Sequence, residues 1–174
     1  MTKRSGQTQH YENLIESILR NNEILYIAID EKKRPLYGER KIKNFDIIVS
    51  SFKGKYLIDV KGKQFSYGKS GFWENWIRID DIYGLMTWST HFYGFTPLLV
   101  YPYLLKNDTY KKEFSDIFEY EGSIYGIVAI ELSTYYLNAK SRSKGWNAIS
   151  ISNNKFRELV KPLSYYIPEI TRKW

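Results

Sequence analysis

The stretch NFDIIVSSFKGKYLIDVK, residues 44–61, contains two apolar segments separated by a short polar turn. Asn44–Ser51 and Lys55–Lys61 are rich in β-branched and aromatic residues, which favour strands. The residues between them, Phe52-Lys53-Gly54, have the length and composition of a tight connection. The sequence therefore predicts a β-hairpin here, and the remaining elements are placed around it.

The apolar hairpin carries charged residues at Asp46, Asp59 and Lys61. Side chains two positions apart on a strand share a face, so Asp59 and Lys61 should project together, and Asp46 can meet them across the hairpin. Burying unpaired carboxylates among apolar residues is expensive. We therefore expect the two acids to lie at strand ends or at a local break in a strand.

Two converging carboxylates form a hard-oxygen site that suits Mg²⁺, with Mn²⁺ as a substitute. The metal ion would polarise a phosphate and activate a bound water, and Lys61 would orient that water or help to deprotonate it. The alternative is structural. Asp46, Asp59 and Lys61 would then be solvent-facing charges that protect an edge hairpin from aggregation.

The remaining periodicities place the hairpin in an α/β chain. Apolar residues recur at helical spacing in an early segment, where Thr8 can cap the helix, and Asp80 can cap a second one. The expected elements are a helix over Thr8–Arg20, a strand over Glu23–Asp30, a basic loop over Glu31–Lys43, the hairpin, a helix from Asp80 to about Phe92, a strand over Phe95–Leu105, a hairpin over Phe118–Glu131 turning at Glu121-Gly122, and a short helix from Asn153 or Asn154. Their order is αβββαβ with additions.

Size and composition limit the classes of function. The 174 residues fit one domain, and the lack of cysteine excludes disulfides, zinc–thiolate sites and thiol nucleophiles. The first twenty residues lack the apolar core of a signal peptide, and no stretch approaches the roughly 18 apolar residues of a membrane span. We therefore expect a cytoplasmic protein that has no membrane partner.

The net charge of +7 and the isoelectric point near 9.3 favour a polyanionic partner. Basic residues flank the hairpin on both sides, as a nucleic-acid groove requires, although charge runs are usually solvated surface. The candidates are Lys32, Lys33, Arg34, Arg40, Lys41, Lys43, Lys63 and Lys69. Trp73 and Trp76 can stack on bases, but aromatic residues at this spacing are more often part of a core.

Asp46, twelve intervening residues and Asp59-Val60-Lys61 resemble the D-x(n)-(D/E)-x-K motif of the restriction-endonuclease-like (PD-(D/E)xK) nucleases, which carry it on a β-hairpin. The element order, an early helical Glu and the short length are similar to archaeal Holliday junction resolvases. The segments HYE (10–12), FDIIVSS, LIDVKGK and WENWIRIDD look closer to uncharacterised bacterial members. Two positions depart from the common pattern: Phe45 replaces a proline, and Asp59 stands where Glu is common.

This resemblance covers about residues 8–105, so that about 106–174 would be a C-terminal extension within a single domain over residues 1–174. It implies a restriction-endonuclease-like core, with a mixed central sheet flanked by helices, and metal-dependent cleavage of DNA. It also implies that Glu12 helps to bind the metal ion and that two copies pair as a homodimer. Gln64 would contact a phosphate or base by this resemblance, and the alternative is a plain loop residue.

Several acidic and imidazole groups have alternative interpretations. Glu16 lies one turn after Glu12, but Glu12 is nearer the apolar face of the helix. Asp80 and Asp81 are best explained by capping and the helix dipole. His10 either contacts substrate or is a surface or capping group.

Three classes of function follow. The first is Mg²⁺-dependent phosphodiester hydrolysis of DNA, as an endonuclease on structured or duplex DNA, with RNA as the alternative substrate. The second is a noncatalytic nucleic-acid-binding module on the same fold, and the third is a protein-interaction domain. The combination of Asp46, Asp59 and Lys61 favours the first, because the other two have no need of it.

Overall fold

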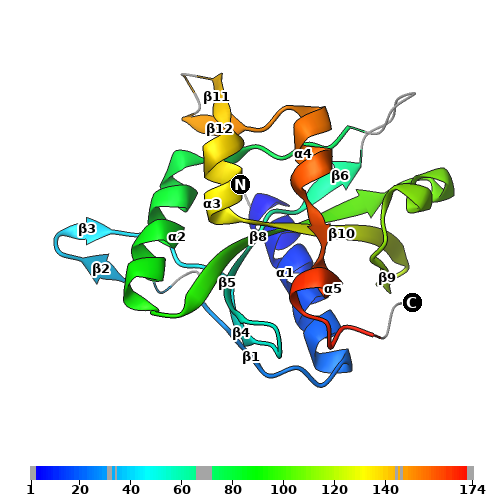
Figure 1. Cartoon of the computed structure of the whole chain (residues 1–174), viewed down its shortest axis with the longest axis horizontal. Coiled ribbons are helices and arrows are strands. Elements are labelled where there is room, and N and C mark those ends of the chain that lie inside the picture. The colour runs from blue at the N-terminus through cyan, green and yellow to red at the C-terminus, as the bar shows by residue number, and fades with distance from the viewer. Residues whose placement is uncertain are drawn as a thin grey trace.

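The computed structural model describes residues 3–30, 33, 35–65, 72–143, 145 and 147–171, in which helices flank a central sheet (Figure 1). The helices are α1 (Lys3–Asn21), α2 (Ile79–His91), the 3-10 helix η1 (Asp108–Glu113), α3 (Leu132–Asn138), α4 (Asn153–Leu159) and α5 (Leu163–Tyr166). The strands are β1 (Tyr26–Ala28), β2 (Leu36–Tyr37), β3 (Arg40–Lys41), β4 (Ile47–Ser50), β5 (Lys55–Val60), β6 (Lys63–Phe65), β7 (Ile77–Arg78), β8 (Phe95–Leu105), β9 (Ile117–Tyr120), β10 (Ser123–Glu131), β11 (Lys140–Ser143), β12 (Ala148–Ser150) and β13 (Lys161–Pro162). Among these residues, no helix is long and apolar enough to cross a membrane.

The central sheet has eight strands and mixed directions. Its main path is β1-β4-β5-β8-β10-β13, while β6 also pairs with β8 and β9 with β10. The first three strands are antiparallel, β5 and β8 run parallel, and β8 and β10 are antiparallel again. This confirms the predicted α/β fold class with a mixed sheet flanked by helices. The order αβββαβ corresponds to α1, β1, β4, β5, α2 and β8.

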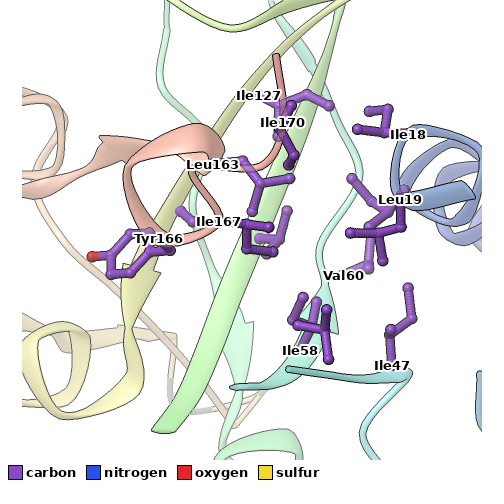
Figure 2. Close-up of a cluster of buried hydrophobic side chains, with 14 of the residues drawn as sticks. Ile18, Leu19, Ile47, Ile58, Val60, Ile127, Leu163, Tyr166, Ile167 and Ile170 are labelled. Atoms are coloured by element: carbon purple, nitrogen blue, oxygen red, sulfur yellow. The ribbon is translucent and has the colours of Figure 1, made fainter. Parts of the chain in front are cut away.

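Successive side chains of the strands point to opposite faces of the sheet and pack into two apolar layers, one on each face. In the first layer, Ile18 and Leu19 of α1 pack with Ile47, Ile58 and Val60, and residues of the C-terminal segment join them (Figure 2). The second layer joins the sheet to α2, α3 and α4 through residues that include Leu57, Leu99, Ile82, Leu85, Tyr135 and Phe156. Strand β5 is therefore buried on both faces, whereas β4 buries Ile47 and Val49 but leaves Ile48 partly exposed and Ser50 exposed.

The starts of the two long helices differ from the expectation. Helix α1 begins at Lys3, so Thr8 lies inside the helix instead of capping it. Helix α2 has Arg78 as its N-cap with no side-chain cap hydrogen bond, so the expected cap at Asp80 is also wrong. Side-chain capping is a local preference, and in the first turn of α2 the contacts of Asp81 with Lys43 and Lys61 override it.

The expected strand over Glu23–Asp30 is shorter, because its first residues belong to the turn that ends α1. Glu23 has a φ of 58°, and the Ile24 amide donates to the Leu19 carbonyl at 2.9 Å. Within the expected basic loop Glu31–Lys43, strands β2 and β3 form a hairpin around Gly38, whose φ is 61°. This hairpin projects beside α2 (Figure 1).

The later elements of the structure agree with those that the sequence predicts. Strand β8 spans the expected residues Phe95–Leu105, and β9 and β10 turn at Glu121-Gly122, where the φ angles are 49° and 71°. Helix α4 begins at Asn153 as expected. Strand β10 pairs with β8 along much of its length, so residues after Leu105 complete the central sheet.

Candidate active site

The candidate site lies where β5 is interrupted. Strand β5 ends at Val60, the Lys61 amide donates to the Val100 carbonyl at 2.8 Å, and pairing with β8 resumes at Lys63. Gly62 lies in this break, and a Cβ there would come within 1.9 Å of the Tyr11 ring of α1. Helix α1 can therefore approach the break closely, which brings the residue after Tyr11, Glu12, to this end of the sheet.

Asp46 and Asp59 stand opposite one another across the hairpin. Ile47 pairs with Ile58 in the ladder, so the preceding Asp46 comes level with Asp59, and the Asp46 amide donates to the Ile58 carbonyl at 2.9 Å. Asp46 Oδ2 accepts a hydrogen bond from the Val60 amide at 2.6 Å. Both residues are 5% exposed and Glu12 is 7% exposed. The acids lie at a strand end and beside a break, where we expected them.

Burial and like charge act together on these carboxyl groups. Burial raises the pKa of Asp46 well above its usual range; Asp59 and Glu12 raise it further, while Lys61 and the Val60 amide oppose the rise. Burial also raises the pKa of Asp59 to about 6, against the opposing effect of Lys61. Holding both groups ionised therefore costs free energy that a bound cation would offset.

Lys61 links this acidic pair to a third aspartate, Asp81, on the first turn of α2. Lys61 Nζ lies 2.7 Å from Asp59 Oδ2 and 3.3 Å from Asp81 Oδ2. Asp81 also pairs with Lys43 through its other oxygen, and its side chain is only 10% exposed. Charges therefore alternate along the chain of contacts Lys43, Asp81, Lys61 and Asp59.

This arrangement fixes the protonation states of Lys61 and Asp81. Burial alone would lower the pKa of Lys61, but Asp59, Asp81 and Asp46 together raise it above its ordinary value. Burial would raise the pKa of Asp81, but Lys61 and Lys43 lower it. Lys61 is therefore a cation and a hydrogen-bond donor in this structure. Its expected part in deprotonating a water stays a prediction, and it would require the neighbouring carboxylates to release their hold on the ammonium group.

Asp81 is the site residue that sequence reasoning missed. We assigned Asp80 and Asp81 alike to capping, but they differ: Asp80 is exposed and pairs with Arg78 at 3.2 Å, whereas Asp81 is buried between two lysines. The only local signal is that adjacent residues on a helix point in different directions. The way in which α2 packs on the sheet decides which of the two aspartates faces Lys61 and which remains exposed.

The donor set suits a hard divalent cation in chemistry. Among the described residues, no group of three or more His, Cys, Asp or Glu side chains is placed to hold a metal ion. Mg²⁺ usually keeps several waters and needs only one or two protein carboxylates. The opposed Asp46 and Asp59 meet that smaller requirement, provided that Lys61 releases Asp59.

The expected nucleic-acid contacts have different environments. Lys43 is part of the charge network described above, and Lys63 Nζ lies 3.9 Å from the centre of the Trp76 ring, where burial lowers its pKa to about 8. Gln64 and Lys33 are exposed. Arg40 and Lys41 are exposed on the β2–β3 hairpin, while Lys32, Arg34 and Lys69 lie outside the described residues.

Of the three remaining candidates, His10 and Trp73 make contacts within the fold and Trp76 is partly exposed. The Nε2 atom of His10 lies 2.7 Å from the Tyr125 hydroxyl and Nδ1 lies 3.2 Å from Glu121, so His10 joins α1 to the β9–β10 hairpin. Trp73 is 3% exposed and packs in the core, as the sequence favoured. Trp76 is partly exposed and lies between Lys63 and Arg142, the latter 5.8 Å from its ring.

Comparisons with known proteins give no match in sequence but a similarity in structure. No family model and no curated protein matches the sequence. Among solved structures, the chain is similar to Hjc, a Holliday junction resolvase from the archaeal hyperthermophile Archaeoglobus fulgidus. The match covers 91% of this chain and 90% of that chain, with 11% sequence identity and a TM-score of 0.45.

Proposed function

We propose that this chain is a divalent-metal-dependent nuclease of the restriction-endonuclease-like type, which hydrolyses phosphodiester bonds of DNA as an endonuclease. The observation that carries the proposal is the pair of buried carboxylates, Asp46 and Asp59, opposed at the break in β5 with the Lys61 cation beside them. Their spacing in sequence, D-x12-D-x-K, is the motif that such nucleases carry on a hairpin.

The energetics of the site support a role for cation binding. Burial raises the pKa of both carboxyl groups and Asp59 further raises that of Asp46, so the ionised pair destabilises the fold unless positive charge compensates it. Lys61 supplies a single positive charge and shares it with Asp81. Asp46 and Asp59 would hold Mg²⁺, or Mn²⁺ in its place, and Glu12 of α1 would have to move closer to them to become a third ligand. When bound, the ion supplies Lewis acidity toward the phosphate and lowers the pKa of a bound water.

Lys61 would act on the phosphate as a cation. Its raised pKa keeps it protonated, so it can donate hydrogen bonds to phosphate oxygens and stabilise the negative charge of the transition state. It must first leave Asp59, and Asp81 offers a second carboxylate that keeps the ammonium group in place. Lys43, on the other oxygen of Asp81, fixes that carboxylate in turn.

The test uses labelled four-way junction, flapped, nicked and plain duplex DNA, together with RNA, incubated with the purified chain in Mg²⁺, Mn²⁺ or EDTA. We expect cleavage of at least one DNA substrate in Mg²⁺ or Mn²⁺, none in EDTA, and a loss of about 10²-fold or more in Asp59→Asn. Calorimetric titration with Mn²⁺ should show binding that Asp59→Asn abolishes.

Asp108→Asn is the matched control, because Asp108 carries the same carboxylate on an 85% exposed side chain away from the hairpin. It should cleave and bind Mn²⁺ as the parent protein does. Nucleic-acid binding without cleavage in either metal would assign the chain to the noncatalytic class instead. Homodimerisation, which paired cuts would require, stays a prediction that light scattering can test.

A further inference from the structure

A groove of about 730 Å³ separates the β2–β3 hairpin from α2. Its lining includes Tyr37, Arg40, Lys41, Lys43 and Tyr83, together with one carboxylate, Asp80, which pairs with Arg78 at 3.2 Å. The two walls meet where the Tyr37 ring contacts the His91 ring edge-on, with their centres 5.2 Å apart. The groove therefore has one wall from a projecting hairpin and one from a helix that also carries a residue of the candidate active site.

One side of the groove adjoins the candidate active site, because Lys43 lines the groove and also pairs with Asp81. Helix α2 packs closely on the backbone of Lys43, since a Cβ at Gly84 would lie 2.7 Å from the Lys43 carbonyl oxygen. The Trp88 indole donates to the same oxygen at 3.0 Å. The Lys43 side chain then pairs with Asp81, which pairs with Lys61. A strand lying in the groove would thus contact Lys43, which is linked to Lys61 through Asp81.

The walls combine free positive charge with accessible aromatic rings. Arg40 and Lys41 are exposed, and within the described part of the chain neither has a carboxylate oxygen within 4.0 Å. Tyr37 is 55% exposed and Tyr83 is 64% exposed. Basic side chains alternating with exposed rings are the combination that binds single-stranded nucleic acid, through phosphate contacts and base stacking.

We propose that this groove binds an unpaired stretch of nucleic-acid strand, with bases stacked on Tyr37 and Tyr83 and phosphates paired with Arg40 and Lys41. In a duplex, neighbouring base pairs already cover both faces of each base, so the tyrosine rings would gain nothing from paired DNA. An unpaired segment has free faces to offer. Binding of the strand does not depend on the proposed nuclease function. Only the further statement that the strand belongs to a substrate, with its unpaired stretch next to the cleaved bond, rests on that function.

The test measures binding by fluorescence anisotropy in EDTA, with a labelled single-stranded DNA, a single-stranded RNA of the same sequence and the matched blunt duplex. We expect Tyr37→Ala and Tyr83→Ala each to weaken single-strand binding by about tenfold, with little change for the duplex. Tyr37→Phe and Tyr83→Phe keep the rings and should bind like the parent protein. The DNA and RNA arms identify which strand the groove prefers.

Tyr93→Ala is the matched control, because Tyr93 is 98% exposed just beyond α2 and does not line the groove. It should bind every oligonucleotide as the parent does, and thermal melting should show all variants folded. Unchanged single-strand binding in both alanine variants would overturn the inference, as would an equal loss for strand and duplex.

The two proposals fail in distinguishable ways. If the parent cleaves in Mg²⁺ while Tyr37→Ala and Tyr83→Ala bind single strands normally, the groove assignment falls and the nuclease stands. If those variants lose single-strand binding and the parent cleaves nothing in either metal, the nuclease proposal falls and the groove remains a binding site.

Discussion

Asp116 and the Asp46–Asp59 pair are both buried acidic sites, but the donors around them differ. Asp116 is 0% exposed and accepts hydrogen bonds from the Ser164 amide at 2.7 Å and the Ser164 hydroxyl at 2.8 Å, one on each carboxylate oxygen. Its own carbonyl accepts from the Ile127 amide at 2.9 Å. Asp116 thereby joins the start of α5 to the central sheet.

Asp46 and Asp59 each lie beside another carboxylate as well as beside a hydrogen-bond donor. Asp46 accepts from one backbone amide at 2.6 Å, and Asp59 faces an ammonium group that Asp81 also contacts. A lone carboxylate with a donor for each oxygen has a structural explanation. Two carboxylates that repel one another do not, because replacing them by neutral groups would make the fold easier to maintain.

The largest effect is expected from replacing Lys61, whose positive charge offsets the negative charges of Asp46 and Asp59. Lys61→Ala should reduce the cleavage rate by roughly 10²-fold or more, because the transition state loses its cationic donor. Metal-free DNA affinity should change little, since many other basic side chains contribute to it. The measurement is single-turnover cleavage of the best substrate alongside binding in EDTA. A variant that cuts as fast as the parent would reduce Lys61 to a structural counterion.

An intermediate effect, on stability alone, is expected at Asp116. Asp116→Ala removes the acceptors of both Ser164 hydrogen bonds and should lower the free energy of unfolding by about 1–3 kcal/mol. Urea unfolding of the parent and the variant measures this difference. Asp108→Ala, an exposed control, should stay within about 0.5 kcal/mol of the parent. Cleavage by the folded fraction of Asp116→Ala should be normal, and its specific loss would give Asp116 a part in the chemistry.

The smallest effect should have the opposite sign. Asp46→Asn keeps an oxygen for the Val60 amide but removes a buried negative charge, so we expect the metal-free protein to gain about 0.5–2 kcal/mol at neutral pH. The folded-state pKa of Asp46 is raised, so its carboxyl stabilises the fold below its unfolded pKa and loses that contribution as pH rises through the folded value. The gain in Asp46→Asn should therefore be small in acid and grow toward neutral pH.

Urea unfolding in EDTA across this pH range measures the Asp46 effect, with Asp80→Asn as the control, since Asp80 is a half-exposed aspartate. The control should show no comparable pH-dependent gain. Added Mn²⁺ should stabilise the parent and leave Asp46→Asn unchanged. If Asp46→Asn were less stable than the parent at every pH, the buried pair would be a stabilising feature and its comparison with Asp116 would reverse.

The sequence by itself determined the features that depend on neighbours along the chain. Strand periodicity placed Asp59 and Lys61 on one face, and the short connection of the hairpin placed Asp46 opposite Asp59. The strand over Phe95–Leu105 and the turn at Glu121-Gly122 could also be predicted, because each depends on residues that are neighbours in the sequence. The polarity of the two acids also predicted that they would lie at a strand end or break, because the alternative would bury them inside a strand.

Only the tertiary structure decided which distant residues complete the site. Asp81 could not be distinguished from Asp80 until the docking of α2 placed one between Lys43 and Lys61 and left the other exposed. Glu12 comes close enough to raise the pKa of Asp46 because Gly62 lets Tyr11 approach the break. The groove of the β2–β3 hairpin likewise exists only between two separately formed elements. Local preferences fix where a side chain points on its own element, whereas packing between elements fixes what it meets.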